Sequence, residues 1–298
     1  MTLLVQKPTG AKLLVQKPTG GKLNITPTAA LVDDPDAMTY LAAVEAADGQ
    51  ALEPATRLAV NAFIKGCKAD GIWPAIKASC ILSGARTLAG ALVPLVGSAP
   101  TNNNFVSGDY NRKTGLVGNR SNKSLRTGLL ASSLGNTSHH FFVHGTSFRT
   151  TAAPSACNLG GVYNGSSLSS LVDIIEASIT PVLRETRSGT GGNSPTNSAT
   201  ISTGLTASGS ISMSRTATNN LRLYQNGVSI ASATSSNTPS LPAVAFSVFA
   251  RNNNGTEGEH TDARLAFYSV GDGLSAPLHT LLDARVTALI NAFAAAIP

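Results

Sequence analysis

Leu221–Ala233 reads LRLYQNGVSIASA and holds the clearest structural signal in the sequence. Two runs of alternating apolar and polar residues flank Asn226 and Gly227. Both turn residues tolerate positive φ angles, and this pair between two alternating runs is a strong short-range signal for a β-hairpin. The stretch therefore predicts two antiparallel strands joined by a two-residue turn.

Short runs of the same kind continue on both sides of this hairpin, separated by Gly, Asn and Ser. The clearest of them span residues 243–250 and 263–270. Residues 187–211 are of low complexity and rich in Gly, Ser and Thr, which predicts a long loop with one weak strand at 199–202. The alternation of short strands and turns predicts an antiparallel β-sandwich over residues 101–272.

Residues 33–100 are rich in alanine and predict a small antiparallel helical module. Cap and spacing signals place four helices there, at 37–47 with Asp36 as N-cap, from Pro54 onward, at 75–82 and at 85–95. In the second helix, Leu58, Phe63 and Cys67 recur at helical spacing. We expect these three side chains to form a core face.

Residues 273–298 predict one amphipathic helix over 277–297. Its apolar residues follow steps of four and three, as in a heptad repeat, at Leu282, Val286, Leu289 and Phe293. Two heptads are short for a coiled coil. The helix either joins subunits along this seam or lies along the sandwich of its own chain, and the sequence favours neither.

Residues 1–32 contain a ten-residue repeat, LLVQKPTGAK at 3–12 and LLVQKPTGGK at 13–22. Each copy joins a short apolar run to the turn residues Pro-Thr-Gly. Because one copy cannot bury its apolar face alone, we expect this arm to add strands to a neighbouring subunit by β-augmentation. Folding back onto its own domain is the alternative. The assembly residues would be Leu3, Leu4, Val5, Leu13, Leu14 and Val15.

The composition excludes several classes of protein. Of the 298 residues, 42% are hydrophobic and 13% charged, which argues against disorder, and no apolar run reaches the length of a membrane helix. The net charge is +6, but the basic residues are scattered, so we expect no nucleic-acid partner. Three cysteines without C-x-x-C spacing predict buried thiols, and no secretory leader is recognisable.

Three of the five histidines lie in one predicted strand, at His139, His140 and His144. The last two share a face, as two metal ligands would, but no acidic residue lies nearby in sequence. We therefore expect these histidines to face water. No Ser-His-Asp or Cys-His arrangement is recognisable, so the sequence predicts no catalytic residue, metal or cofactor.

The most polar part of the β-region is the segment 251–262. Its amide and carboxylate groups are suited to sugar hydroxyls or to Ca²⁺, although their spacing matches no known metal loop. A solvated hairpin connection is the alternative. The candidate ligand residues are Asn252, Asn253, Asn254, Glu257, Glu259, His260 and Asp262.

Several blocks together resemble a family of structural proteins of tailed bacteriophages. These blocks are residues 40–53, 66–73, 77–88, 105–116, 261–271 and 282–286. The resemblance implies a virion component at the tail or the head surface, with a jelly roll of the concanavalin A or laminin G type. It names no catalytic residue. The chain departs from the family through its few aromatic residues and its Ser- and Thr-rich segment 187–211.

The sequence thus predicts an α+β protein made of a helical module, an antiparallel β-sandwich and a C-terminal helix. We expect a non-enzymatic virion protein of the tail, baseplate or tail fibre, whose arm and Ala-lined helices pack against neighbouring molecules and whose lectin-like domain serves assembly or host-surface attachment. It would be a homo-oligomer, with a trimer favoured, assembled with other virion proteins in the host cytoplasm. A head decoration or head-fibre protein is one alternative. A carbohydrate-binding module or weak glycan hydrolase that contacts a host-surface glycan is the other.

Overall fold

The computed structural model separates the chain into two compact units, residues 1–33 and 34–298. It describes residues 2–6, 12–16, 33–148, 157–163, 169–174, 206–233 and 241–298. The predicted weak strand at 199–202 and most of the predicted loop at 187–211 lie outside these residues.

The first unit is built from the two copies of the repeat. Strand β1 (Thr2–Gln6) pairs antiparallel with β2 (Lys12–Gln16), and the register sets Leu4 opposite Leu14. Each copy therefore supplies one strand of a two-stranded sheet. Addition of these strands to a neighbouring subunit stays a prediction.

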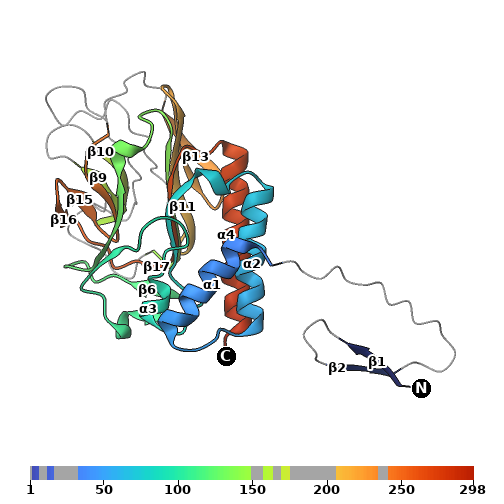
Figure 1. Cartoon of the computed structure of the whole chain (residues 1–298). Helices are drawn as coiled ribbons and strands as arrows, with labels where there is room; N and C mark the ends of the chain where they lie inside the picture. Colours follow the sequence, from blue (N-terminus) through green and yellow to red (C-terminus); the bar gives the residue numbers. More distant parts are fainter. Residues whose placement is uncertain are drawn as a thin grey trace, which may run out of the picture. The chain divides into compact units, whose positions relative to one another are not determined.

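The second unit contains the predicted β-sandwich (Figure 1). One sheet has the order β16-β15-β9-β14-β7-β4, with β10 also paired to β9. All pairs in this sheet are antiparallel except β15 with β9. Its strands are β4 (Thr101–Asn103), β7 (Ser124–Leu130), β9 (Cys157–Tyr163), β10 (Ser169–Ile174), β14 (Ala245–Val248), β15 (Arg251–Asn253) and β16 (Thr256–Gly258).

The other sheet has eight strands in the order β13-β12-β11-β8-β17-β6-β5, with β3 also paired to β17. Its strands are β3 (Ile76–Ile81), β5 (Tyr110–Asn111), β6 (Gly115–Val117), β8 (His139–Ser147), β11 (Gly209–Ala217), β12 (Asn220–Gln225), β13 (Val228–Ala233) and β17 (Arg264–Gly271). The hairpin prediction is confirmed: β12 and β13 meet at Asn226 and Gly227, with φ angles of 51° and 73°.

Strand β3 corrects the sequence prediction of a helix at 75–82. Its register sets Cys80 opposite Tyr268 of β17 and Ala78 opposite Val270. Five of its six side chains are buried, so burial on both faces decides the conformation of this Ala- and Ser-containing segment. The fourth predicted helix, 85–95, shrinks to α3 (Leu88–Ala91).

Three longer helices form the rest of the unit, α1 (Pro35–Asp48), α2 (Pro54–Ala69) and α4 (Ala276–Ala296). The N-cap of α1 is Asp34 rather than the predicted Asp36, because the Asp34 carboxylate accepts the backbone N–H of Asp36 at 2.9 Å. In α2 the buried face includes Val60, Phe63 and Cys67, whereas Leu58, predicted in the core, is 51% exposed.

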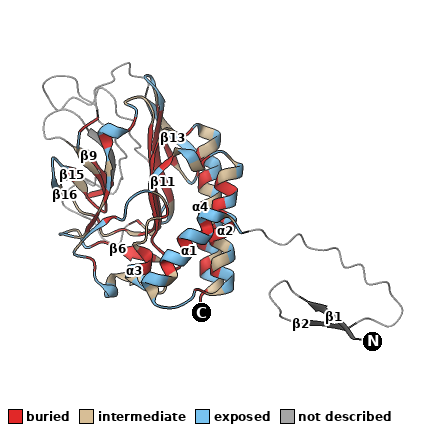
Figure 2. Cartoon of the chain, in the orientation of Figure 1, coloured by how far each residue is buried: buried red, intermediate tan, exposed pale blue. Residues whose placement is uncertain are grey.

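The central strands of the eight-stranded sheet, β8, β11 and β17, are buried on both faces. One face packs on the other sheet, with Phe141 of β8 and Phe246 of β14 stacked at a ring separation of 6.3 Å. The other face packs on the helices, where Phe267 of β17 meets Phe63 of α2 at 5.6 Å and Phe142 at 6.0 Å. Figure 2 shows the resulting band of buried residues on the sheet and on the helix faces turned toward it.

This packing decides what the apolar helix faces cover. The heptad residues of α4, Leu282, Val286, Leu289 and Phe293, are all at most 2% exposed and belong to the core of their own chain. The helix therefore lies along its own sandwich, and the expectation that the apolar faces of the helices pack on neighbouring molecules is wrong for these residues. Helices α1, α2 and α4 form a single layer over the eight-stranded sheet, so the apolar residues of α4 share one core with that sheet (Figure 1).

Two smaller observations concern the described residues. None of their helices is long and apolar enough to cross a membrane. The three cysteines are buried and form no disulfide, as predicted, and burial raises the pKa of Cys67 and Cys80 to about 12.

Phe267 is the aromatic contact through which the sheet holds the helices, and its removal tests this packing. We expect Phe267→Ala to lower the free energy of unfolding by about 3–5 kcal/mol, because it leaves a cavity between two elements. Urea titration followed by circular dichroism measures the loss. Val228→Ala, at a side chain that is 63% exposed, is the control and should change stability by less than about 0.5 kcal/mol. A loss below about 1 kcal/mol in Phe267→Ala would contradict the packing.

Candidate functional site

The polar segment 251–262 forms a hairpin at one end of the seven-stranded sheet. Strands β15 and β16 pair with Asn252 opposite Glu257, and Asn254 and Gly255 form the turn with φ angles of 48° and 100°. Asn252 is buried; its amide donates to the carbonyl of Ala245 at 2.7 Å and its side-chain oxygen accepts from Gly255 at 2.8 Å. Asn253 and Asn254 are exposed, and His260 is half-buried, which lowers its pKa. The side-chain amide of Asn252 thus stabilises the hairpin.

Each carboxylate of this segment is paired with an arginine. Glu257 accepts from Arg126 of β7 at 2.7 Å and from Ser247 of β14 at 3.2 Å. Glu259 pairs with Arg251, and Asp262 lies 3.2 Å from the guanidinium of Arg120. These pairs neutralise the groups that a hard cation would need. Within the described part of the chain, no group of three His, Cys, Asp or Glu side chains is arranged to hold a metal ion.

Two buried polar atoms beneath this hairpin lack a hydrogen-bond partner among the described residues. The Arg251 guanidinium lies over the Tyr163 ring, 4.8 Å from its centroid, and also pairs with Glu259. Glu259 accepts a second bond from the side-chain amide of the buried Asn158. Among the described residues, neither Asn158 Oδ1 nor Arg251 Nε has a partner. Because both atoms are buried, an outside molecule can reach only the partly exposed Tyr163 ring and the exposed side chains of Asn253 and Asn254 near them.

The histidines of β8 are buried, which corrects the expectation that they face water. His140 and His144 share the face of β8 that the helices cover, and they are 1% and 7% exposed. The His140 Nδ1 donates to the carbonyl of Asp272 at 2.6 Å, and Nε2 accepts from Ser269 at 2.8 Å. His279 of α4 lies 6.3 Å from His140, ring to ring. His139 is buried as well.

His279 connects α4 to the sheet. Its ring stacks on Tyr224 of β12 at 4.2 Å, and Nδ1 lies 3.2 Å from the hydroxyl of Ser212. Burial lowers the pKa of His140 and of His144 to about 4, and burial together with the nearby His140 lowers that of His279 well below its usual value. These rings are therefore neutral parts of the core at neutral pH, and they form no metal centre.

The buried histidines make the fold sensitive to acid. Because the unfolded chain binds protons near pH 6.5 and the folded rings resist them to about pH 4, the free energy of unfolding should fall as the pH is lowered through this window. His144→Leu should flatten this slope and leave stability at pH 7 nearly unchanged, since His144 Nδ1 has no partner among the described residues. Urea titrations at pH 7, 6 and 5 measure both effects. His260→Leu, at a half-buried ring, is the control and should change the slope less; equal slopes in wild type and His144→Leu would contradict this account.

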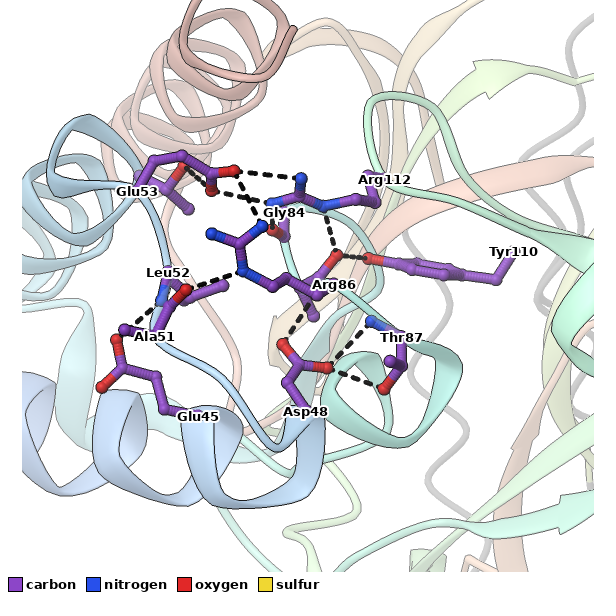
Figure 3. Close-up of polar contacts among 12 residues, drawn as sticks. Glu45, Asp48, Ala51, Leu52, Glu53, Gly84, Arg86, Thr87, Tyr110 and Arg112 are labelled. Carbon is purple, nitrogen blue, oxygen red and sulfur yellow. Dashed lines mark hydrogen bonds and ion pairs between the residues drawn. The ribbon is translucent and has the colours of Figure 1, made fainter.

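A second polar cluster joins segments far apart in the sequence (Figure 3). Glu53, at the start of α2, binds Arg112 through two hydrogen bonds of 3.1 and 2.8 Å and lies 3.2 Å from Arg86. Arg112 also donates to the carbonyl of Ala85 at 3.0 Å, as does the Tyr110 hydroxyl at 2.7 Å. The cluster thus fastens the connection between α1 and α2 to the loops that follow β3 and β5.

Asp48, at the end of α1, holds the other side of this cluster (Figure 3). Its carboxylate accepts the backbone N–H groups of Arg86 and Thr87 at 2.7 and 2.8 Å and the Thr87 hydroxyl at 2.7 Å. The contacts join residues from three of the blocks that carry the resemblance, 40–53, 77–88 and 105–116. Sequence reasoning did not find the cluster, because no local spacing links Glu53 to Arg112.

The bidentate pair of Glu53 with Arg112 predicts a second acid transition. The two guanidinium groups hold the pKa of Glu53 at about 2, so its contribution is present above pH 4.5 and is lost as the pH falls from 4.5 toward 2. We expect Glu53→Gln to cost about 1–2 kcal/mol of unfolding free energy at pH 7, between the values of exposed and buried pairs. Asp272→Asn, in the more exposed pair with Lys77, is the matched control and should cost less than about 0.5 kcal/mol. Thermal unfolding measures both variants, and equal losses of stability in Glu53→Gln and Asp272→Asn would contradict a special role of Glu53.

The structure also shows a groove that the sequence did not indicate. It has a volume of about 370 Å³ and is lined by α1, the turn at Trp73 and the segment 93–96. Trp73 is the only tryptophan of the chain, and the Lys68 ammonium lies 5.7 Å from its ring centroid. The polar residues on its wall are already bonded: Thr39 donates to Pro35, and Asp36 pairs with Lys68.

No family model and no curated protein matches this chain. Solved structures with a similar fold include the NanB sialidase from Streptococcus pneumoniae, with 14% identity and a TM-score of 0.37 over 55% of this chain and 26% of that one. They also include the CBM40 of the Ruminococcus gnavus IT-sialidase bound to α2,3 sialyllactose, with 14% identity and a TM-score of 0.39 over 49% and 83%. A leech intramolecular trans-sialidase gives 12% identity and a TM-score of 0.40 over 62% and 27%. The chain thus spans about a quarter of the length of the two whole sialidases. The likeness concerns the lectin-like fold alone.

Proposed function

We propose that this chain is a non-enzymatic structural protein of a tailed-bacteriophage particle, anchored by its N-terminal arm and presenting its β-sandwich at the tail or baseplate. The main support for this proposal is the pairing of the two repeats. They form a two-stranded sheet in a unit of their own, and among the described residues neither strand has a second partner. Since a two-stranded hairpin is marginally stable in water, its free edges favour addition to another sheet.

Most polar side chains that could act in catalysis are buried or bonded to other side chains of the chain, which supports a role without catalysis. The carboxylates of the segment 251–262 pair with arginines, the thiols of Cys67 and Cys80 have raised pKa values, and His140 and His144 of β8 are buried and neutral. A glycan hydrolase needs two carboxyl groups facing each other across a cleft, one of them ready to donate a proton. These groups are instead used to hold the sandwich together.

Particle labelling tests the proposal directly. Gold-conjugated antibodies against the sandwich should label the tails of purified particles of the phage that encodes this chain, and a chain lacking residues 1–30 should fold but fail to enter particles. Circular dichroism of the shortened chain checks its folding. Absence of the protein from particles would contradict the virion assignment, and normal incorporation of the shortened chain would contradict the role of the arm. Label on heads alone would favour a capsid decoration protein.

A carbohydrate-binding role is the second candidate, and the corner formed by Tyr163, Asn253 and Asn254 favours it. The partly exposed Tyr163 ring, against which the Arg251 guanidinium lies, offers an apolar platform, and the exposed amides of Asn253 and Asn254 can donate hydrogen bonds to sugar hydroxyls and accept them. A glycan array with and without Ca²⁺ tests this role. The role is supported if the wild type binds a glycan, Arg251→Ala loses this binding and Arg222→Ala keeps it. Absence of binding by the wild type both with and without Ca²⁺ would contradict it.

A further inference from the structure

The repeated unit of the arm is complementary to itself as a β-strand. Each strand of the hairpin carries one copy of the sequence LLVQ, at 3–6 in β1 and at 13–16 in β2. In the antiparallel register the central leucines, Leu4 and Leu14, lie opposite each other, and on either side of them the first leucine of one copy lies opposite the valine of the other. Because every copy of this chain carries the same unit, the arm of a second copy can make the same cross-strand pairs.

The hairpin also has one wholly apolar face. Successive residues of a strand belong to opposite faces of a sheet, so each face takes alternate residues of both strands. The residues on the apolar face are Leu3, Val5, Leu13 and Val15. A two-stranded hairpin is marginally stable in water, and independent stability needs three or more strands with such a face. Joining two arms edge to edge supplies the strands that one arm lacks.

The edges of the sandwich are less suited to receive the arm. The strand orders of its two sheets end in β16 and β4 and in β13 and β5. Three of these strands have only two or three residues. The fourth, β13, has six, but its pairing with β12 shifts register between Leu223 and Tyr224. Short edge strands and bulges are features that prevent pairing with another chain. The second arm is therefore the better partner.

Within the arm, the outer edge of β1 suits this pairing better than that of β2. Among the described residues, each of the two strands pairs only with the other. Strand β1 has no charged residue, whereas β2 begins with Lys12, and lysine on an edge strand discourages pairing. Pairing of β1 with the β2 of a next copy would continue from chain to chain, and closing such a ring needs a stagger between strands that this register lacks. Pairing of β1 with β1 closes on two copies about a two-fold axis.

We propose that two copies of this chain join through the β1 strands of their arms, antiparallel and with Leu4 opposite Leu4, into one four-stranded sheet. The apolar faces of the two hairpins then lie on the same side of the sheet, because Leu3 of one copy lies opposite Val5 of the other. This inference rests on the proposed function, since it names the sheet that the anchoring arm joins. It predicts a dimer in place of the trimer favoured by the sequence, because a two-fold contact is complete with two copies.

Disulfide trapping in the full chain tests the register. Leu4→Cys should give a cross-linked dimer under mild oxidation, because residue 4 lies opposite itself and facing residues of antiparallel strands have Cα atoms about 4.5–5.5 Å apart, within disulfide range. Leu14→Cys makes the same change at the matching position of β2 and should not cross-link. The native cysteines are buried, so the wild type should not cross-link either. Non-reducing gel electrophoresis measures the dimer.

Sedimentation equilibrium tests the same contact without cross-linking. The wild type should dimerise reversibly at concentrations up to about 100 μM, since two strands of five residues make a small interface. Leu4→Lys should weaken dimerisation at least about 10-fold, because it places like charges opposite each other. Leu14→Lys disturbs the hairpin at the residue opposite Leu4 but lies away from the contact, so it should weaken dimerisation less. Mixing Leu4→Lys with Leu4→Glu should restore dimers.

Three results would overturn the pairing. The first is a wild type that stays monomeric at the highest concentration, with no cross-link in Leu4→Cys. The second is cross-linking of Leu14→Cys equal to or above that of Leu4→Cys, and the third is equal weakening of dimers by Leu4→Lys and Leu14→Lys. With any of these, exclusion of the chain lacking residues 1–30 from particles would still support the proposed function. A chain that dimerises as expected but is absent from particles would instead contradict the proposed function and leave the pairing standing.

Discussion

The structure depends on two strands that are buried on both faces. The side chains of β8 and β17 alternate between the core of the sandwich and the core beneath the helices, so each strand stabilises both layers. A shift of the helical layer would expose Phe142 and Phe267 to water, and a change in the sandwich would displace Phe141. The helices are therefore part of the sandwich protein rather than a module attached to it.

The same constraint explains where polar groups are found. Beneath the helices, histidines occupy positions that must be buried, and their neutral rings bond to Ser269, Ser212 and a backbone carbonyl. At the polar end of the other sheet, carboxylates meet arginines in pairs. Most chemically versatile side chains of the described residues thus hold the fold together. What remains for contact with other molecules is the arm and the polar corner formed by Tyr163, Asn253 and Asn254.

The sequence predicted the features that local chemistry determines. The Asn226–Gly227 turn, the start of α2 at Pro54 and the end of α1 within one residue of the predicted 47 follow from φ preferences and capping, which act within a few residues. Strand β3 was missed because Ala78 and Ser79 suit either conformation, and only pairing with β17 decides. Burial of the β8 histidines was missed because the covering helix α4 lies more than a hundred residues away in sequence. The cluster around Glu53 was missed for the same reason.

Hydrogen exchange of the full-length protein tests the shared core most directly. If the sheet and the helices form one cooperative unit, the slowest amides of α2, α4, β8 and β17 should exchange with the same free energy of opening, equal to that of global unfolding. Helical amides that open several kcal/mol more easily than those of β8 and β17 would show that the helices form a separate layer, and would contradict this account.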